Sequence, residues 1–292
     1  MPGFTSIRDY VAACEAGRCR SASLRKVPSN ASTPSRWVDL SMAPGNPQPN
    51  YYVGTPLEGT RLNYAGSPDV VRDGGIYHGA DISPQSLHLA SWMLETPTSG
   101  LVGEYMLLDY LLFYPFLDLD DTAQQVLDNA VTLPRYEDGA GVRAMLVVTA
   151  PTAGGGSFTF DYVDQDGNAK TSPTQSYSTA VAGIQSIPTS EPATAAGGQP
   201  FLQLLGGDSG VRSITSWTNI APGGGLAALV LVRPLASHAI YEVSTPSEIE
   251  LVTQRAAPPR IYDGAYLGMI MRCAATVAAG LLAGRLTYVW ST

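Results

Sequence analysis

Charged side chains are scarce in this sequence, because only 14% of its 292 residues are Asp, Glu, Lys or Arg. Ordinary soluble domains carry about 25%. Disorder does not explain the difference, since 45% of the residues are hydrophobic and supply ample material for a core. A surface with few charges is poorly protected against association. We therefore expect other subunits to cover much of this surface in the working state.

Clusters of positive charge are also nearly absent, and the net charge is −8. The chain therefore lacks the electrostatic footprint of a nucleic-acid-binding protein, and we expect no direct contact with DNA or RNA. One short basic stretch occurs at residues 18–26 and contains Arg18, Arg20, Arg25 and Lys26. We interpret it as a solvated or partner-facing arm.

Cysteine and histidine occur three times each. Cys14, Cys19 and Cys273 form no C-x-x-C motif and have no histidine nearby, so the sequence predicts neither a disulfide framework nor a zinc site. We expect no cofactor and no metal, and a reducing compartment. The first ten residues include an Asp and no apolar run, which argues against a secretory signal.

One hydrophobic segment could be mistaken for a membrane span, residues 267–284, an 18-residue stretch with one charge, Arg272. This length only reaches the lower limit for a membrane helix, and the stretch contains Gly268, Gly280 and Gly284. We expect a buried pair of short elements and no membrane contact.

Few helices are expected. In residues 4–17, one helical face would carry Phe4, Ile7, Tyr10, Val11 and Cys14. Ser6 and Asp9 have capping-box spacing there, and Gly17 is a stop signal. A second short helix is predicted at residues 120–129, with Asp120 as its N-cap.

Residues 27–85 are rich in Pro, Gly, Ser and Asn, with isolated apolar residues. We interpret them as an extended arm whose anchors, Trp37, Val38, Leu40 and Tyr51, dock on something else. The predicted organisation is an N-terminal helix with an arm and loop region (residues 1–103), followed by a β-sandwich-like body (residues 104–292).

Short strand-like runs dominate the second region. They lie at residues 142–148, 157–163, 211–220, 226–232 and 239–243. Phe158, Phe160 and Tyr162 alternate onto one face. The predicted fold class is mainly β, with a β-sandwich or jelly-roll-like body, a loop-rich N-terminal region and one or two short helices.

Two acidic segments resemble metal sites. Asp164, Asp166 and Asn168 alternate as at the start of a calcium loop, but the Gly comes too early and Gln175 replaces the final Glu. A hairpin turn explains the same residues. The second segment contains Asp118, Asp120 and Asp121 and has no His or Glu at ligand spacing, so we interpret it as structural.

Residues 207–210 spell Gly-Asp-Ser-Gly, the tetrapeptide around the nucleophile of chymotrypsin-like proteases. Ser209 would need an imidazole base and an orienting acid. The order His78, then Asp118 or Asp121, then Ser209 satisfies that requirement in sequence.

The local sequence argues against such a triad. His78 lacks the Ala-Ala-His-Cys surroundings of that family, and His88 lies in an apolar run; the third histidine is His238. Val211 replaces the second Gly and also breaks the G-x-S-x-G pattern. We predict a turn here and a strand at 211–220. One face of that strand would carry Ile214, Ser216, Thr218 and Ile220, and the other Ser213, Thr215, Trp217 and Asn219.

Segments of residues 104–270 resemble a group of virion structural proteins of tailed bacteriophages. These segments are "YMLLDYLLFYPFLD", "LPRYEDGAGVRAMLVVTAP", "FTFDYVDQDGNAK", "LLGGDSGVRSITSWTNIAPGGGLAALVLVRPLA" and "PPRIYDGAYLGMI". The resemblance implies a non-enzymatic particle component that is assembled in the bacterial cytoplasm and found in the mature virion.

The low charge and extended arm favour a capsid decoration (cement) protein that binds the major capsid protein lattice as a homo-oligomer, with a trimer favoured. A neck or tail protein remains an alternative. A β-sandwich that binds carbohydrate through exposed aromatics such as Trp217 or Tyr262 is another, and a serine hydrolase using Ser209 is the most remote.

Overall fold

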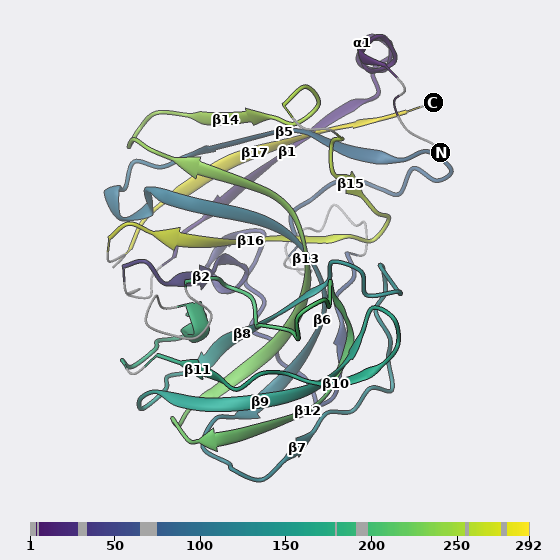
Figure 1. Cartoon of the computed structure of the whole chain (residues 1–292). Coiled ribbons are helices and arrows are strands. Elements are labelled where there is room, and N and C mark those ends of the chain that lie inside the picture. The colour runs from purple at the N-terminus through teal and green to yellow at the C-terminus, as the bar shows by residue number, and fades with distance from the viewer. Residues whose placement is uncertain are drawn as a thin grey trace.

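The structure is a computed structural model that describes residues 4, 6–28, 34–64, 75–178, 180–190, 198–254, 257–275 and 279–291. It is mainly β, as predicted, and its strands form three antiparallel sheets (Figure 1). The helices of the described ranges are one α-helix and three 3-10 turns. They are α1 (Ile7–Glu15), η1 (Leu40–Met42), η2 (Ser99–Leu101) and η3 (Pro188–Ser190).

The first sheet contains the first and last strands of the chain, and we call it the terminal sheet. Its order is β14 (Ser247–Glu250), β5 (Leu87–Glu95), β17 (Leu282–Trp290), β1 (Cys19–Lys26) and β3 (Gly45–Asn46), with β15 (Arg260–Ile261) also paired to β5. β17 lies between β5 and β1. Strands from both sides of residue 103 therefore share one sheet, so the predicted division at 103/104 does not separate the sheets.

The central sheet lies below the terminal sheet in Figure 1. Its order is β2 (Trp37–Asp39), β16 (Tyr266–Cys273), β6 (Gly103–Asp118), β13 (Leu226–Ile240) and β8 (Arg143–Ala150), with β4 (Thr60–Arg61) also paired to β6. β6 and β13 have 16 and 15 residues and pair along almost their whole length. Most of β6 is buried, which matches its nearly continuous apolar sequence.

The third sheet, at the bottom of Figure 1, is called the distal sheet here. Its order is β10 (Ala169–Thr171), β9 (Gly156–Asp164), β12 (Val211–Ala221) and β7 (Gln125–Val126), with β11 (Gln175–Tyr177) also paired to β9. Phe158, Phe160 and Tyr162 all point into the core, which confirms the predicted alternation.

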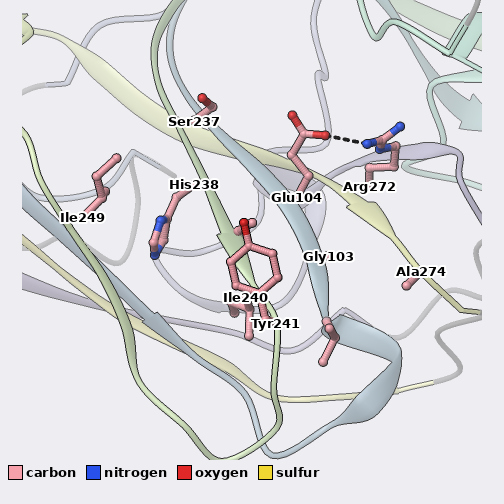
Figure 2. A pocket seen from close by; sticks show the side chains of 11 residues that line it. Gly103, Glu104, Ser237, His238, Ile240, Tyr241, Ile249, Arg272 and Ala274 are labelled. Atoms are coloured by element: carbon pink, nitrogen blue, oxygen red, sulfur yellow. Dashed lines mark hydrogen bonds and ion pairs between the residues drawn. The ribbon is translucent and has the colours of Figure 1, made fainter. Parts of the chain in front are cut away.

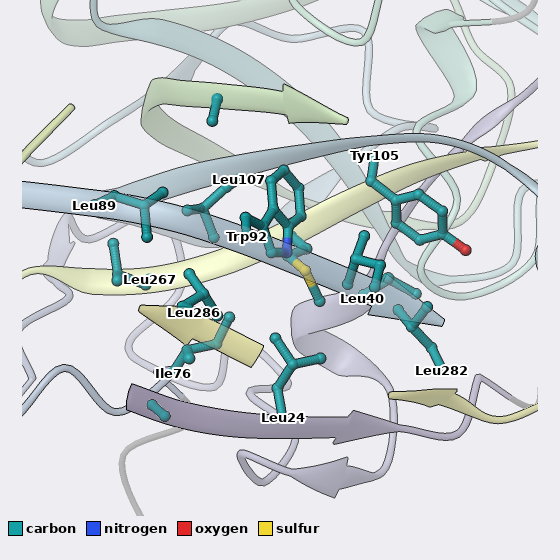
Figure 3. Close-up of a cluster of buried hydrophobic side chains, with 14 of the residues drawn as sticks. Leu24, Leu40, Ile76, Leu89, Trp92, Tyr105, Leu107, Leu267, Leu282 and Leu286 are labelled. Atoms are coloured by element: carbon teal, nitrogen blue, oxygen red, sulfur yellow. The ribbon is translucent and has the colours of Figure 1, made fainter. Parts of the chain in front are cut away.

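Three large hydrophobic clusters surround the central sheet. The first joins it to the terminal sheet through residues such as Leu107, Leu267, Trp92 and Leu286 (Figure 3). The second joins it to the distal sheet, where Leu117 and Leu231 share a cluster with Phe158, Phe160 and Trp217. The third occupies the other face and includes Leu108, Tyr110, Val230, Trp37 and Ile187. One pair of long strands thus contributes to all three clusters.

Residues 185–187 connect the two edges of the central sheet. On one side, Asp39 N donates to Gln185 O at 2.8 Å and Ile187 N donates to Trp37 O at 2.9 Å. On the other side, Val148 N donates to Ser186 O and Gln185 N donates to Val148 O, both at 2.9 Å. The segment therefore covers strand edges that would otherwise present unpaired backbone groups.

A buried ion pair lies within this apolar framework. Asp109, in the middle of β6, is 1% exposed and accepts hydrogen bonds from Arg135 Nε at 2.9 Å and Nη2 at 2.8 Å. Tyr266 N also donates to Asp109, at 3.0 Å. The remaining Arg135 donors reach the Asn63 side chain and the Leu62 and Tyr110 carbonyl oxygens. Each charge is well hydrogen-bonded, which is the condition under which a buried pair is tolerated.

The sequence predicted the first helix and the C-terminal hydrophobic stretch well. Ser6 caps α1 by accepting from Asp9 N at 3.2 Å, and Gly17 follows with a φ of 72°. Within residues 267–284, residues 267–273 lie in β16 and residues 282–284 begin β17, while residues 276–278 lie outside the described part. None of the helices in the described ranges has the length and hydrophobicity needed to span a membrane.

The predicted helix at residues 120–129 is wrong. The Asp118 carboxylate accepts from Asp120 N and the Asp121 carboxylate accepts from Ala123 N, both at 2.8 Å, which produces successive turns. Gln125 then enters β7 and pairs with Trp217 of β12. Side-chain bonds to the local backbone have competed successfully with helix formation.

The arm interpretation of residues 27–85 also needs correction. Trp37, Val38 and Leu40 are buried in cores of their own chain, because β2 pairs with β16. Tyr51, the fourth predicted anchor, is exposed. Residues 29–33 and 65–74 lie outside the described part. The basic stretch at 18–26 is mostly strand β1, and Lys26 on its inward face is buried.

β12 departs from the predicted alternation. Ile214 and Trp217 are both fully buried although they were assigned to opposite faces. The register passes from the Ile214–Tyr162 pair to the Ser216–Asp161 pair, so Thr215 is an extra residue. Such a β-bulge reverses which residues face the core. The predicted strand at 239–243 likewise ends at Ile240, and Tyr241 and Val243 are exposed.

The buried ion pair makes a strong prediction about stability. Arg135→Met leaves the Asp109 charge buried without its partner, so we expect the free energy of unfolding to fall by about 3–5 kcal/mol. Arg272→Met is the control, because the Arg272–Glu104 pair, with side chains 45% and 34% exposed, is expected to contribute below about 1 kcal/mol. Urea denaturation measures both. Equal losses in the two variants would contradict the assignment.

Candidate functional site

The Gly-Asp-Ser-Gly segment forms the predicted turn before β12. Ser209 N donates to Gln165 Oε1 at 3.0 Å, and Ser209 O accepts from Gly141 N at 3.1 Å. The Asp208 carboxylate accepts from the Tyr162 hydroxyl. Within the ranges that the structure describes, hydrogen bonds join the Ser209 hydroxyl to none of the three histidines.

Each of the three histidines contacts other residues of its own chain. Nε2 of His78 lies 2.9 Å from Ala265 O, and burial lowers the pKa of His78 to about 4. Nε2 of His238 lies 3.0 Å from Ser247 O. His88 is half-buried and packs near Phe4, and burial lowers its pKa. The carboxylates of Asp118 and Asp121 accept from their local backbone, so these residues serve turns, and the triad that the local sequence argued against is not found at Ser209.

The calcium-like segment is a hairpin turn between β9 and β10, as predicted. The Asp164 carboxylate accepts from Asp166 N at 2.9 Å and from Asn168 N at 2.8 Å. Gly167 takes the left-handed conformation with a φ of 86°. The described residues include no group of three or more His, Cys, Asp or Glu that is arranged to hold a metal ion.

The aromatic residues suggested for carbohydrate binding do not form a recognition surface. Trp217 is fully buried, stacks on Phe158 with ring centroids 4.0 Å apart, and donates from Nε1 to Asn219. Tyr262 is half-buried between Arg260, whose guanidinium lies 4.3 Å from the ring centroid, and Tyr136. The Trp217 assignment was wrong because the bulge in β12 turns this side chain inward.

A buried polar cluster that the sequence did not reveal lies around Asp39, the last residue of β2. Its carboxylate accepts from Ser41 N at 2.8 Å, from Ser41 Oγ at 2.9 Å, from Tyr110 OH at 2.7 Å and from Tyr52 OH. Burial raises the pKa of Asp39 although these bonds oppose the change. Because the carboxylate is fully enclosed, the cluster fixes residues 39–52 to β6 and offers no access to a ligand.

Lys26 is a second buried polar group near this cluster. Its Nζ donates to Ala43 O at 3.1 Å and to Pro47 O at 2.8 Å. Burial lowers the pKa of Lys26 to about 8. Period-2 alternation along β1 places Lys26 on the same inward face as Ala22 and Leu24, and that alternation was the available signal.

The strongest candidate for a contact site is a pocket of about 660 Å³ where the central and terminal sheets meet (Figure 2). It forms where β6 begins and β13 and β16 end, with β14 on one side. Its lining consists of Val102, Gly103, Glu104, Ser237, His238, Ala239, Ile240, Tyr241, Ile249, Arg272 and Ala274.

This pocket combines apolar surface with a charged rim. Arg272 Nη2 and Glu104 Oε2 lie 2.7 Å apart and form the ion pair drawn in Figure 2. Tyr241, directly after β13, is 82% exposed. Gly103 permits the close approach of β6 to β16, because a Cβ there would lie 2.2 Å from Arg272 O. No local sequence pattern marks the pocket, since its residues come from four separate segments.

The buried histidine predicts a measurable pH dependence. An unfolded chain has a His pKa of about 6.5, so between pH 4 and 6.5 the unfolded state binds more protons at residue 78 than the folded state does. The stability that this residue supports is therefore lost as the pH falls through that window, by up to about 3 kcal/mol.

His78→Gln, whose amide also donates to Ala265 O, should remove that dependence. Urea denaturation at pH 7 and pH 4.5 should show a larger loss of stability in the wild type than in the variant. Parallel losses in both proteins would contradict a buried neutral His78.

No protein-family model and no curated protein matches the chain. Among solved structures, "Structure of infectious bursal disease virus Gt strain" is 10% identical, with 94% of this chain and 81% of that chain covered and a TM-score of 0.19. "Crystal structure of infectious bursal disease virus VP2 subviral particle" is 9% identical, with 93% and 80% covered and a TM-score of 0.17. Scores this low carry no argument about this chain. The resemblance to phage virion proteins therefore stays a prediction.

Proposed function

We propose that this chain is a non-enzymatic structural component of a bacteriophage virion, most specifically a capsid decoration (cement) protein that binds the major capsid protein lattice. The observation that carries the proposal is a sparsely charged surface on which large apolar side chains are exposed to solvent. Tyr241, Val53 and Val126 are each more than two-thirds exposed, and they lie in separate parts of the fold. Such side chains are typical of surfaces that a partner covers.

The sequence resemblance and the architecture support the same proposal. The three antiparallel sheets are joined by hydrophobic clusters that all include residues of β6 and β13. The residues that suggested chemistry, Ser209, Asp118 and Asp164, all serve local turns. We propose assembly in the host bacterial cytoplasm and a symmetric homo-oligomer, with a trimer as the favoured state.

The pocket beside Tyr241 is the contact that we propose for the capsid lattice. An aromatic side chain next to an apolar hollow with a charged rim is the usual arrangement at the centre of a protein interface. The partner would insert an apolar side chain into the hollow and cover Tyr241, while the Glu104–Arg272 pair stays at the edge.

The proposed location is tested on purified particles. We expect the protein to co-sediment with intact capsids at on the order of tens to hundreds of copies per particle, as a lattice component requires. Electron microscopy of the particle should then place it on the capsid face. Absence from particles would exclude a virion role, whereas a few copies at the neck or tail would exclude the decoration role.

The proposed contact is tested by Tyr241→Asp in rebinding to particles that lack the protein. We expect the affinity to fall by about tenfold or more, because a central interface tyrosine is lost and a charge is introduced. The thermal midpoint should not change, since Tyr241 makes little contact with its own chain. Tyr51→Asp, another exposed tyrosine, is the matched control. Equal losses of affinity in both variants would contradict the pocket as the specific contact.

A further inference from the structure

Two cysteine sulfurs lie close together where α1 joins β1. Sγ of Cys19 lies 2.9 Å from Sγ of Cys14, and both thiols are free and half-buried. A disulfide requires about 2.05 Å between its sulfurs. The two atoms therefore need to approach by less than an ångström.

The turn between the two cysteines is held by backbone hydrogen bonds. Gly17 N donates to Cys14 O at 3.0 Å, and Arg18 N donates to Ala13 O at 2.9 Å. Gly17 has a φ of 72°, the left-handed conformation that ends many helices. This reversal brings a residue of the last helical turn next to the first residue of β1.

Packing on the terminal sheet fixes both sides of this turn. Cys19 pairs with Val289 of β17. Ala13 forms a small buried cluster with Ala90 and Val289, and Cys14 and Cys19 pack against it. The proximity of the thiols is therefore a consequence of how α1 sits on the sheet.

We propose that Cys14 and Cys19 are a redox modification site, at which a small-molecule disulfide such as glutathione disulfide oxidises the pair to a reversible intramolecular disulfide. This inference does not depend on the proposed virion role. It adds a side-chain cross-link between α1 and β1, which are otherwise covalently joined only by the main chain of residues 16–18.

The chemistry proceeds by thiol–disulfide exchange. The Cys14 thiol releases its proton to solvent, and the thiolate attacks one sulfur of glutathione disulfide. The S–S bond of the reagent breaks, and the first glutathione leaves as a thiolate that takes up a proton. The Cys19 thiol then loses its proton, attacks the Cys14 sulfur and expels the second glutathione in the same way. The protein pair is oxidised by two electrons, and glutathione disulfide is reduced to two thiols.

The order of attack follows from the surroundings of the two sulfurs. Burial, together with the hydrogen bond to Cys14, raises the pKa of Cys19 to about 12. A thiolate is the attacking species, so the first attack comes from Cys14. Once the Cys14 sulfur is bonded to glutathione, it can no longer carry the negative charge that opposes deprotonation of Cys19.

The disulfide would hold α1 in place on the terminal sheet. α1 makes few contacts with the rest of the chain, and Ile7 and Val11 on it are exposed. Short elements with few buried contacts open locally at low free-energy cost. A bond between Cys14 and Cys19 limits that opening in oxidising surroundings and is removed in reducing ones.

The experiment uses the full chain, incubated with glutathione disulfide, alkylated with iodoacetamide and digested with trypsin. Cleavage after Arg8, Arg18 and Arg20 places Cys14 in the peptide 9–18 and Cys19 in the peptide 19–20. Cleavage after Arg272 and Arg285 places Cys273 in the peptide 273–285. We expect peptides 9–18 and 19–20 joined by a disulfide that dithiothreitol removes, and slower amide exchange across residues 7–15 in the oxidised protein.

Variants separate this site from general thiol oxidation. Cys273→Ser should form the same linked pair. Cys19→Ser should stop at the mixed disulfide between Cys14 and glutathione, and Cys14→Ser should react far more slowly than Cys19→Ser. Alkylation of both Cys14 and Cys19 in the treated wild type would overturn the proposal, as would a link from either residue to Cys273.

Discussion

The pairing of β6 with β13 is the constraint on which the rest of the structure depends. Most of β6 and the first half of β13 are buried on both faces, and residues from these strands enter all three large clusters. Neither neighbouring sheet can bury its inner face without them. The Asp109 carboxylate in the middle of β6 adds a specific requirement, because Arg135 must reach it through the loop before β8. Removing that partner affects the one strand pair that the other sheets share.

The local sequence pattern correctly predicted elements that depend on hydrogen bonds between neighbouring residues. The cap of α1 depends on Ser6 and Asp9, and the β9–β10 turn depends on Asp164, so both could be read from neighbouring residues. The helix expected at 120–129 failed because Asp118 and Asp121 bond their own backbone. The predicted orientation of Trp217 was wrong because β12 contains one extra residue, and a strict alternation of side chains does not account for it.

Long-range features were out of reach of the sequence for a different reason. Trp37 and Leu40 were identified as anchors, but nothing in their spacing says that the surface they cover belongs to the same chain. The pocket beside Tyr241 draws on four segments, so no short motif marks it. The Cys14–Cys19 pair had one local signal, the helix stop at Gly17, and its meaning depended on the strand that follows.

The placement of the exposed apolar side chains distinguishes between kinds of binding protein. Tyr241 lies between the terminal and central sheets, Val126 is on the distal sheet, and Val53 lies in the segment before β4. A protein that recognises one small ligand gathers its apolar contacts in one concave site. A subunit in a repeating shell meets neighbours on several sides and needs apolar contacts on each. Because these side chains are spread over three parts of the fold, they fit several separate contacts better than one concave ligand site.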